Sequence, residues 1–192
     1  MTRDLMYQEE IKESVRQAYS RISAGGGEGV AHRLYGSSEL AEVPVDAIVW
    51  ALGVGNPVRY AFVEAGETIL DIGSGGGIDT ILAAKRTGSN GKAIGLDILE
   101  EMGNRGRRHA VEAGVSEWTE FIQGEMEAIP LESGWVDLVI SNGVINLSGR
   151  KSRTLAEIFR VLKPGGRLCV ADLTVENDLP SEVANDPSAW AG

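Results

Sequence analysis

The stretch that decides the fold is LDIGSGGGID, at residues 70–79. It joins the apolar run TILDI, at 68–72, to a segment of helical length at 77–88. Glycines at positions 73 and 75 let the backbone turn tightly and approach a ligand, because no Cβ stands in the way. A glycine-rich turn between a strand and a helix indicates a site for a nucleotide-like ligand in an α/β fold.

Short apolar runs alternate with helix-length segments after this turn. The predicted strands are 68–72, 92–97, 119–124, 136–141 and 167–173, and the predicted helices are 77–88, 100–114 and 150–163. Strands that alternate with helices form parallel sheets with right-handed crossovers. We therefore predict a Rossmann-like, doubly wound α/β core over residues 67–192, with about five mainly parallel strands in the order 3-2-1-4-5. Gly103 and Gly106 weaken the second helix, since each costs about 1 kcal/mol relative to alanine.

The first 66 residues have a different pattern and are predicted to form a helical cap that belongs to the same domain. Apolar side chains follow helical spacing over 9–22, and the glycines of SAGGGEG end that helix. Two further helices are predicted at 43–53 and 56–66. In the second of these, Asn56 has the position of an N-cap and Pro57 that of the first helical residue.

Composition narrows the possible partners. The chain has 192 residues, with 18 Lys and Arg against 28 Asp and Glu, and a net charge of −10. We therefore expect that it binds neither nucleic acid nor an anionic membrane. No apolar run approaches the ~18 residues of a membrane span, and the first twenty residues are too charged for a signal peptide, which predicts a cytoplasmic protein. A single cysteine, Cys169, excludes an internal disulfide and a cysteine-built metal site, and we predict no metal.

Two acids beside the predicted turn indicate the charge of the ligand. Asp71 precedes the turn, and Asp97 ends the next strand, from where a carboxylate can accept both ribose hydroxyls. A dinucleotide site would have a third glycine where this chain has Ile78. A diphosphate about 4 Å from Asp71 would be repelled by about 4 kcal/mol at an effective dielectric of 20. S-adenosylmethionine carries a positive ammonium and a positive sulfonium on either side of a ribose, so it fits a site with an acid at each end.

At this point the sequence resembles the class I S-adenosylmethionine-dependent methyltransferases, and within them the arsenite methyltransferase group. The resemblance covers nearly all of the chain. The superfamily is marked by DIGSGGG, whereas GNPV, SNGVINLS and the tail LPSEVANDPSAW are similar to the arsenite group in particular. The motifs are ILDIGSGGGIDTILAA (69–84), IGLDILEEM (94–102), GEMEAIPL (124–131), VDLVISNGVINLS (136–148), FRVLKPGGRL (159–168) and VGNPV (54–58).

The resemblance implies a set of cofactor-binding residues. Asp71, Gly73 and Gly75 would face the methionine part of S-adenosylmethionine, and Asp97 the ribose. Ile98 and Met126 would lie against the adenine, with Glu125 and its neighbouring backbone at its edge. Ser74, Met102 and Gly124 would also contact the cofactor. Asn142 would lie close to the methyl group, and Tyr19 would help to close the pocket. The product would be S-adenosylhomocysteine.

The sequence also departs from the family. Arsenite methyltransferases hold trivalent arsenic with cysteine thiolates, and the corresponding positions here are Val54, Gly143 and a cysteine-free GGGEGVAHRLYG. Cys169 lies in an apolar strand, which favours a buried structural thiol. The family continues past the end of this chain with a strand pair that completes a seven-stranded sheet. We therefore predict a small-molecule methyltransferase that does not capture arsenite through thiolates.

Methyl transfer from a sulfonium needs positioning more than acid–base chemistry, so no catalytic residue is assigned. Asn142 and Asn146 are candidates for orienting the acceptor, and strand-end capping or a turn are equal alternatives. His32 and His109 are interpreted as loop and helix-surface residues.

An S-adenosylmethionine-binding protein or inactive relative is the second hypothesis for the function, and a nicotinamide oxidoreductase is the third. The uncovered strand RLCVADL, at 167–173, suggests a homodimer through the sheet edge.

Overall fold

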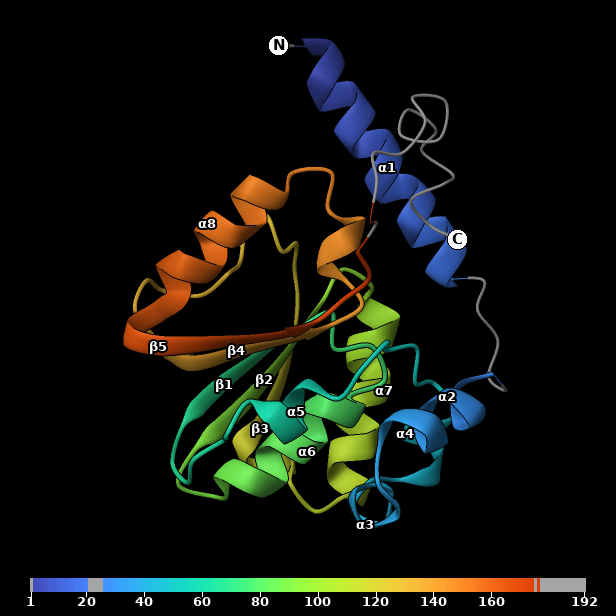
Figure 1. Cartoon of the computed structure of the whole chain (residues 1–192), viewed down its shortest axis with the longest axis vertical. Helices are drawn as coiled ribbons and strands as arrows, with labels where there is room; N and C mark the ends of the chain where they lie inside the picture. Colours follow the sequence, from blue (N-terminus) through green and yellow to red (C-terminus); the bar gives the residue numbers. More distant parts are fainter. Residues whose placement is uncertain (1, 21–25, 175, 177–192) are drawn as a thin grey trace.

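The structure is a computed structural model, and it describes residues 2–20, 26–174 and 176. At its centre is a parallel sheet of five strands in the order β3-β2-β1-β4-β5 (Figure 1). The strands are β1 (Thr68–Ile72), β2 (Lys92–Asp97), β3 (Thr119–Gln123), β4 (Val136–Asn142) and β5 (Leu162–Ala171). The number, direction and order of the strands confirm the prediction from the sequence.

Helices cover both faces of the sheet (Figure 1). On one face α6 (Ile78–Thr87) packs against β1 and β2, and α7 (Glu100–Glu112) packs against β2 and β3. On the other face α8 (Lys151–Val161) packs against β5. Neighbouring residues of β1 point to opposite cores: Ile69 is buried on the α6 side and Leu70 on the α8 side. The bounds of α6, α7 and α8 agree with the predicted helices 77–88, 100–114 and 150–163 to within two residues at each end.

The cap is helical, as predicted, but its helices differ from the prediction. Its elements are α1 (Thr2–Ser20), α2 (Gly27–Leu34), α3 (Ser37–Leu40), α4 (Val45–Ile48) and α5 (Pro57–Tyr60). The predicted helices 43–53 and 56–66 are each a single turn. Asn56 does cap α5, since its Oδ1 accepts the Arg59 N–H at 3.1 Å. The end of the predicted helix 9–22, at 21–22, lies outside the described residues, as does the tail 179–190.

Backbone geometry and contacts within the cap explain why α5 is short and why α2 was not predicted. Phe62 has a φ of 49°, in the left-handed region that ends α5. Helix α2 was not predicted because its first residue, Gly27, was interpreted as a breaker. A Cβ on Gly27 would lie 2.4 Å from the Val49 carbonyl oxygen, so this glycine is needed for close packing rather than for a turn. Local propensity carries no information on such a contact.

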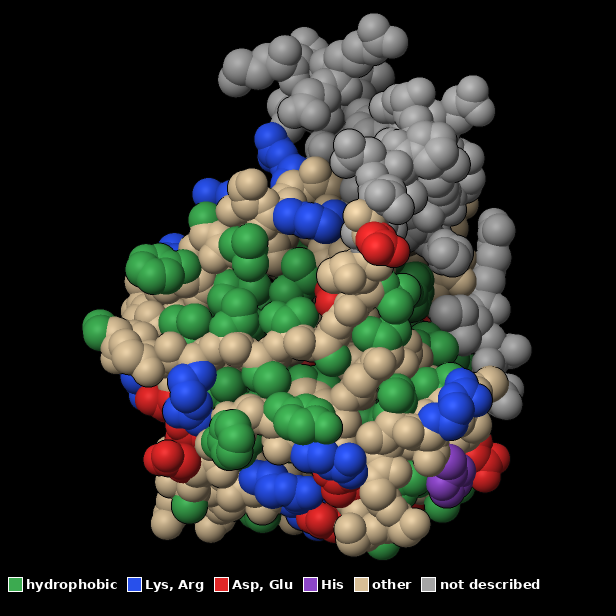
Figure 2. Space-filling view, viewed as in Figure 1, with side chains coloured by type: hydrophobic (Ala, Val, Ile, Leu, Met, Phe, Trp, Pro, Cys, Tyr) green, Lys and Arg blue, Asp and Glu red, His purple; other side chains and the backbone are tan. Residues whose placement is uncertain are grey.

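Strand β5 forms one edge of the sheet and is longer than predicted at its start. It begins at Leu162 and ends at Ala171, and its pairing with β4 shifts register between Val136 and Leu138. Hydrophobic side chains gather over β5 and beside α8 on the face in Figure 2. The exposed ones there include Phe159, Leu155, Leu168 and Val170. None of the helices in the described ranges is long and apolar enough to cross a bilayer.

Candidate functional site

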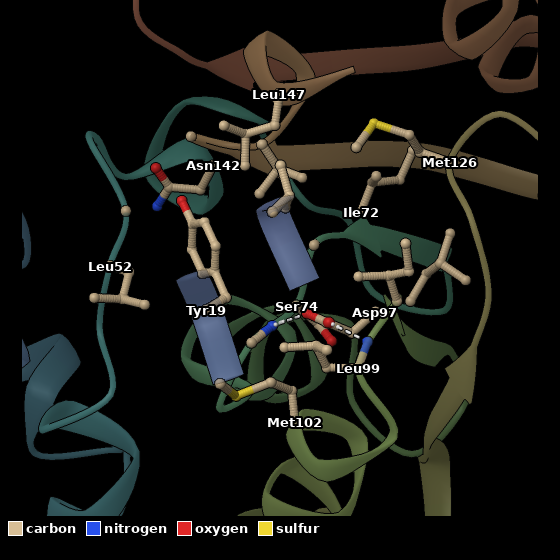
Figure 3. A pocket seen from close by; sticks show the side chains of 18 of the residues that line it. Tyr19, Leu52, Ile72, Ser74, Asp97, Leu99, Met102, Met126, Asn142 and Leu147 are labelled. Carbon is tan, nitrogen blue, oxygen red and sulfur yellow. Dashed lines mark hydrogen bonds between the residues drawn. The ribbon is translucent and has the colours of Figure 1, made fainter. Parts of the chain in front are cut away.

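One cavity lies where the carboxyl ends of β1, β2 and β4 meet the cap (Figure 3). The strand order reverses between β1 and β4, and open α/β sheets bind ligands at such a point. The walls come from the glycine turn at 73–76, from 96–99 after β2, from 124–127 after β3 and from 142–147 after β4. Helix α1 and the segment 50–53 close the cavity from the cap side.

Asp97 lies at the end of β2, where the sequence places it, and lines the cavity. Its Oδ2 accepts the Gly75 N–H and its Oδ1 accepts the Leu99 N–H, each at 2.9 Å (Figure 3). Burial raises the pKa of the Asp97 carboxyl in spite of these two hydrogen bonds. Each carboxylate oxygen can accept a second hydrogen bond. Asp97 can therefore hold the glycine turn and also accept hydroxyl groups of a ligand.

The glycine turn requires glycine at one position and buries one polar side chain. Gly73 has a φ of 76°, and a Cβ there would lie 2.3 Å from Val144, so only glycine fits. The Ser74 side chain is buried at the cavity wall, and its hydroxyl oxygen has no hydrogen-bond partner. An unpaired buried hydroxyl costs about 1–3 kcal/mol. A ligand that hydrogen-bonds Ser74 would remove this cost.

Asp71 does not face the cavity, which differs from the prediction. It is 2% exposed, and its Oδ2 accepts the Thr80 hydroxyl at 2.6 Å behind the turn. Burial, together with the negative charge of Asp79, raises the pKa of Asp71 well above its usual value. Successive strand residues point to opposite faces, so Ile72 lines the cavity and Asp71 points away from it.

Asp79, in the first turn of α6, is the acid that lines this part of the cavity. Its Oδ1 accepts the Tyr35 hydroxyl at 2.9 Å, and its Oδ2 accepts the Asn142 side-chain N–H at 2.9 Å. Burial raises the pKa of Asp79 to about 6. Asp79 was not predicted as a site residue, although it lies within LDIGSGGGID at 70–79. Its position two residues after Gly77, the last glycine of the turn, is the signal that could have identified it.

The Asn142 side chain lines the cavity as expected, but its amide is fully engaged. Its Oδ1 accepts the Val54 and Gly55 N–H groups at 2.8 and 3.0 Å. Its Nδ2 donates to the Gly55 carbonyl at 2.8 Å as well as to Asp79. Gly53 passes so close that a Cβ would lie 2.2 Å from Nδ2. Asn142 therefore clamps the cap segment 53–55 to β4 rather than offering a free amide to a substrate.

Two other predicted roles are corrected. Asn146 does not line the cavity: its backbone N–H donates to Asp172 at 3.0 Å, and its side-chain oxygen is buried without a partner. His109 is 2% exposed rather than on the helix surface. Its Nδ1 lies 2.7 Å from the Gly76 carbonyl oxygen, so the ring packs beneath the glycine turn. His32 is exposed, but it lies in the last turn of α2 rather than in a loop.

Helix α1 is held over the cavity by ion pairs to Glu125. Lys12 Nζ lies 2.5 Å from Glu125 Oε2, and Arg16 Nη2 lies 3.2 Å from Glu125 Oε1. Burial opposes the charge of Lys12, but the Glu125 hydrogen bond and charge raise its pKa above the usual value. Glu125 also lines the cavity, so its contact with an adenine edge stays a prediction, and its ion pairs anchor the helix that carries Tyr19. Tyr19 lines the cavity, and burial raises the pKa of its hydroxyl.

The remaining predicted residues line the cavity, and their contacts with a cofactor stay predictions. Gly75 stands in the turn with a φ of 50° and donates its N–H to Asp97. Apolar side chains surround the space near Asp97, on the side of the cavity away from Asn142 (Figure 3). Ile98, Met102, Gly124 and Met126 all line the cavity. Within the described part of the chain, no three His, Cys, Asp or Glu side chains are grouped to hold a metal.

Comparison with known proteins agrees with this architecture. The family described as a methyltransferase domain matches residues 63–192, two thirds of the chain. The chain belongs to this methyltransferase domain family. The match includes the glycine turn and Asp97, and it leaves the N-terminal cap outside.

Individual relatives extend the likeness into the cap. An arsenite methyltransferase of Halobacterium salinarum is 35% identical over 96% of this chain and 52% of its own length. A ubiquinone/menaquinone biosynthesis C-methyltransferase of a Marinomonas species is 37% identical over 66% of this chain and 51% of its own. A crystal structure of an arsenic(III) S-adenosylmethionine methyltransferase from Chlamydomonas reinhardtii has a TM-score of 0.71, with 38% identity over 78% of this chain and 52% of that one. The chain therefore spans about half the length of these relatives.

The positions where the resemblance to arsenite methyltransferases implies cysteines lie side by side in this methyltransferase domain. A Cβ on Gly143 would lie 3.4 Å from a Val54 methyl group. Cys169 lies elsewhere, half-buried on β5, with its Sγ donating to the Pro57 carbonyl at 3.4 Å. Burial raises the pKa of its thiol, which favours a structural role.

Proposed function

We propose that this domain is an S-adenosylmethionine-dependent methyltransferase that acts on a small molecule. The observation that carries the proposal is the pair of acids that line the cavity, Asp97 at the end of β2 and Asp79 in the first turn of α6. A dinucleotide would bring its pyrophosphate to the glycine turn beside Asp79, where like charges repel. A cofactor with a cationic amino-acid end and an uncharged ribose matches both acids.

The described residues offer a place for each part of S-adenosylmethionine. Asp97 would accept the ribose hydroxyls, and Asp79 would attract the ammonium group. The unpaired Ser74 hydroxyl would hydrogen-bond the amino-acid end. Apolar side chains near Asp97, among them Ile98, Met102 and Met126, would cover the adenine. The product left in the cavity would be S-adenosylhomocysteine.

The bound cofactor supplies an activated methyl group on a sulfonium. The protein residues contribute position and exclusion of water, which can provide most of the rate enhancement for an in-line displacement. Helix α1, held by Glu125, covers the cavity, and the Asn142 clamp fixes the cap segment beside the glycine turn. Arsenite is not the proposed acceptor, because Val54 and Gly143 replace thiolates and Cys169 lies outside the cavity.

A second function, cofactor binding without methyl transfer, is favoured by one observation. The Asn142 amide, the best candidate for orienting an acceptor, is consumed by hydrogen bonds within the protein. An assay for S-adenosylhomocysteine release over a panel of small acceptors, with arsenite included, separates the two functions. Release with any acceptor supports the methyltransferase, whereas tight binding with no release beyond slow hydrolysis supports the second function.

Replacement of Asp97 tests the binding mode. Asp97→Ala should weaken S-adenosylmethionine binding by about 1.5–3 kcal/mol, the range for a hydrogen bond to a charged group. Glu132→Ala, an exposed acid in the loop before β4, is the control and should bind as the wild type does. Calorimetry measures both. An unchanged affinity of Asp97→Ala would show that the ribose is held elsewhere.

We also propose that two copies of the chain associate through the edge strand β5. Among the described residues no strand pairs with the outer edge of β5, and Leu168 and Val170 on it are 42% and 40% exposed. Phe159, on the adjoining α8, is 82% exposed.

The cytoplasmic location of the protein remains a prediction from the sequence.

A further inference from the structure

His109 is a buried polar side chain that the proposed function does not use. It lies on α7, is almost completely buried and does not line the cavity, so it does not touch a bound cofactor. Its Nδ1 lies 2.7 Å from the carbonyl oxygen of Gly76, a residue that does line the cavity. Because a carbonyl oxygen only accepts, this hydrogen bond requires a proton on Nδ1.

The other ring nitrogen of His109 has no hydrogen bond among the described residues. Nε2 is buried, and the Asp46 carboxylate on α4 is 3.5 Å away, longer than a good hydrogen bond. The Asp46 side chain is 72% exposed, so water competes for it. The Gly76 carbonyl is therefore the group that orients the ring, and the ring orients that carbonyl in return.

The hydrogen bond acts on a stretch of backbone that has no side chains to hold it. Gly76 stands between Gly75 and Gly77, whose φ angles are 50° and 91°, and glycine loses more conformational freedom on ordering than any other residue. The Gly77 N–H belongs to the same peptide group as the Gly76 carbonyl, and it donates to the Ser74 carbonyl at 2.8 Å. His109 and Ser74 therefore hold the two polar ends of one peptide group.

The orientation of this peptide group affects what the turn presents to the cavity. The two residues just before it are Ser74, whose buried hydroxyl has no partner in the described residues, and Gly75, whose N–H donates to Asp97 (Figure 3). Rotation of the peptide group would break its hydrogen bond to Ser74 and move both residues. A group that fixes the peptide thus fixes the wall that faces the ligand.

Close packing of α7 beneath the turn makes the contact possible. A Cβ on Gly77 would lie 3.3 Å from the Gly106 Cα, so the turn and the helix meet backbone to backbone. His109 follows Gly106 by three residues and lies on the same face of α7. The ring therefore reaches the Gly76 carbonyl from a rigid element on the side of the turn away from the cavity.

We propose that His109 is a positioning residue for the cofactor. By donating from Nδ1 to the Gly76 carbonyl, it holds the glycine turn in the shape that binds the amino-acid end of S-adenosylmethionine. The inference rests on the proposed function, and it assigns no proton transfer to the ring. Loss of the donor would leave a buried carbonyl unpaired, so the turn would relax toward shapes in which the carbonyl regains a partner.

Two nearly isosteric substitutions test the donor. His109→Asn keeps an N–H group as many bonds from the backbone as Nδ1, whereas His109→Leu places a methyl group there. We expect S-adenosylhomocysteine to bind the full chain about tenfold more weakly after His109→Leu, and within about threefold of wild type after His109→Asn. Asp46→Asn is the control and should bind as the wild type does. Calorimetry measures all four proteins.

A purely structural role for His109 predicts a different pattern. Both substitutions remove the outer part of the ring and leave similar cavities, so they should lower the free energy of unfolding by similar amounts. Equal losses of affinity in the two variants would assign the effect to packing and overturn the inference. Wild-type affinity after His109→Leu would also overturn it, as would a loss after Asp46→Asn that equals the loss after His109→Leu.

The position of the ring proton tests the geometry without a substitution at this residue. The chain has two histidines, and His32→Gln, at an exposed position, leaves only the nitrogen NMR signals of the His109 ring. We expect a proton on Nδ1 in the folded chain. A ring that carries its proton on Nε2 alone would overturn the inference, whatever the two variants do.

Failure of the inference is distinguishable from failure of the proposed function. If the wild type binds neither S-adenosylmethionine nor S-adenosylhomocysteine, the proposed function fails and the inference fails with it. If the wild type binds them and the two variants at His109 bind equally, the inference fails alone. Rescue of binding by His109→Asn but not by His109→Leu, together with a proton on Nδ1, is the result that supports it.

Discussion

Asp79 and Asp71 share one buried cluster on either side of the glycine turn. Asp71 hydrogen-bonds Thr80 behind the turn, and Asp79 faces the cavity with Tyr35 and Asn142 as donors. Both carboxyl groups have raised pKa values, first because burial removes them from water. Binding of a cation beside Asp79 would favour its ionised form. We therefore propose that Asp79, rather than Asp71, supplies the charge that favours a cationic ligand.

Asp79 should make cofactor binding depend on pH. With its pKa at about 6, the carboxylate becomes protonated below that pH, and affinity for S-adenosylmethionine should fall as the solution is acidified. Asp79→Asn should bind about tenfold or more weakly at neutral pH, as expected for loss of a charged hydrogen bond, and lose most of this dependence. Calorimetry across the pH range checks both effects. A wild-type affinity that is flat through pH 6 would remove Asp79 from the binding site.

Asp79 should also make the free energy of unfolding depend on pH. The folded protein holds the Asp79 proton more tightly than the unfolded chain, whose pKa is near 3.8. Its contribution to stability is complete below about pH 4 and is lost as pH rises through about 6. The free energy of unfolding of Asp79→Asn, relative to wild type, should rise by about 3 kcal/mol over that window. Urea unfolding measures it, and a constant difference would contradict the assigned pKa.

Among the elements, α7 shows how packing reverses a judgement from propensity. Gly103 and Gly106 both weaken an isolated helix, and the sequence alone treats them alike. In the structure a Cβ on Gly106 would lie 2.3 Å from the Phe121 ring on β3, whereas one on Gly103 would have its nearest contact at 3.8 Å. Gly106 thus lets α7 approach the sheet, and Gly103 has no such role.

The two glycines form a matched pair for mutagenesis. Gly106→Ala should destabilise the protein by about 1–3 kcal/mol, because the added methyl overpacks the contact with Phe121. Gly103→Ala should be neutral or stabilise by up to about 1 kcal/mol, since it only improves helix propensity. Thermal or urea unfolding compares them. Equal effects of the two substitutions would show that α7 does not sit at the described distance from β3.

At the scale of the whole molecule, the sheet could be predicted and much of the cap could not. Apolar runs bounded by turns, such as TILDI before Gly73, specify strands locally, and parallel topology then limits their order. The short α4 and α5, the missed α2 and the clamp by Asn142 depend on contacts between residues far apart in sequence. Asp97 could be located because its role follows from the end of a strand. The engagement of Asn142 and the burial of His109 required the folded structure.

The exposed β5 edge determines the expected assembly. The chain should have the mass of a dimer in solution at micromolar concentration, because pairing of two edge strands would satisfy their backbone groups and cover Leu168 and Val170. Val170→Lys should shift the population to monomers, while Val45→Lys on α4, 72% exposed in the wild type, should not. Light scattering measures the mass. A monomeric wild type would rule out this interface.

The central claim is that the cavity beside the glycine turn accepts a cationic sulfur nucleoside and rejects a pyrophosphate. Calorimetric titration of the wild-type chain with S-adenosylmethionine, S-adenosylhomocysteine and NADH tests it most directly. Binding of the first two with no heat from NADH is the predicted result. Binding of NADH without binding of S-adenosylmethionine would contradict the assignment of the site.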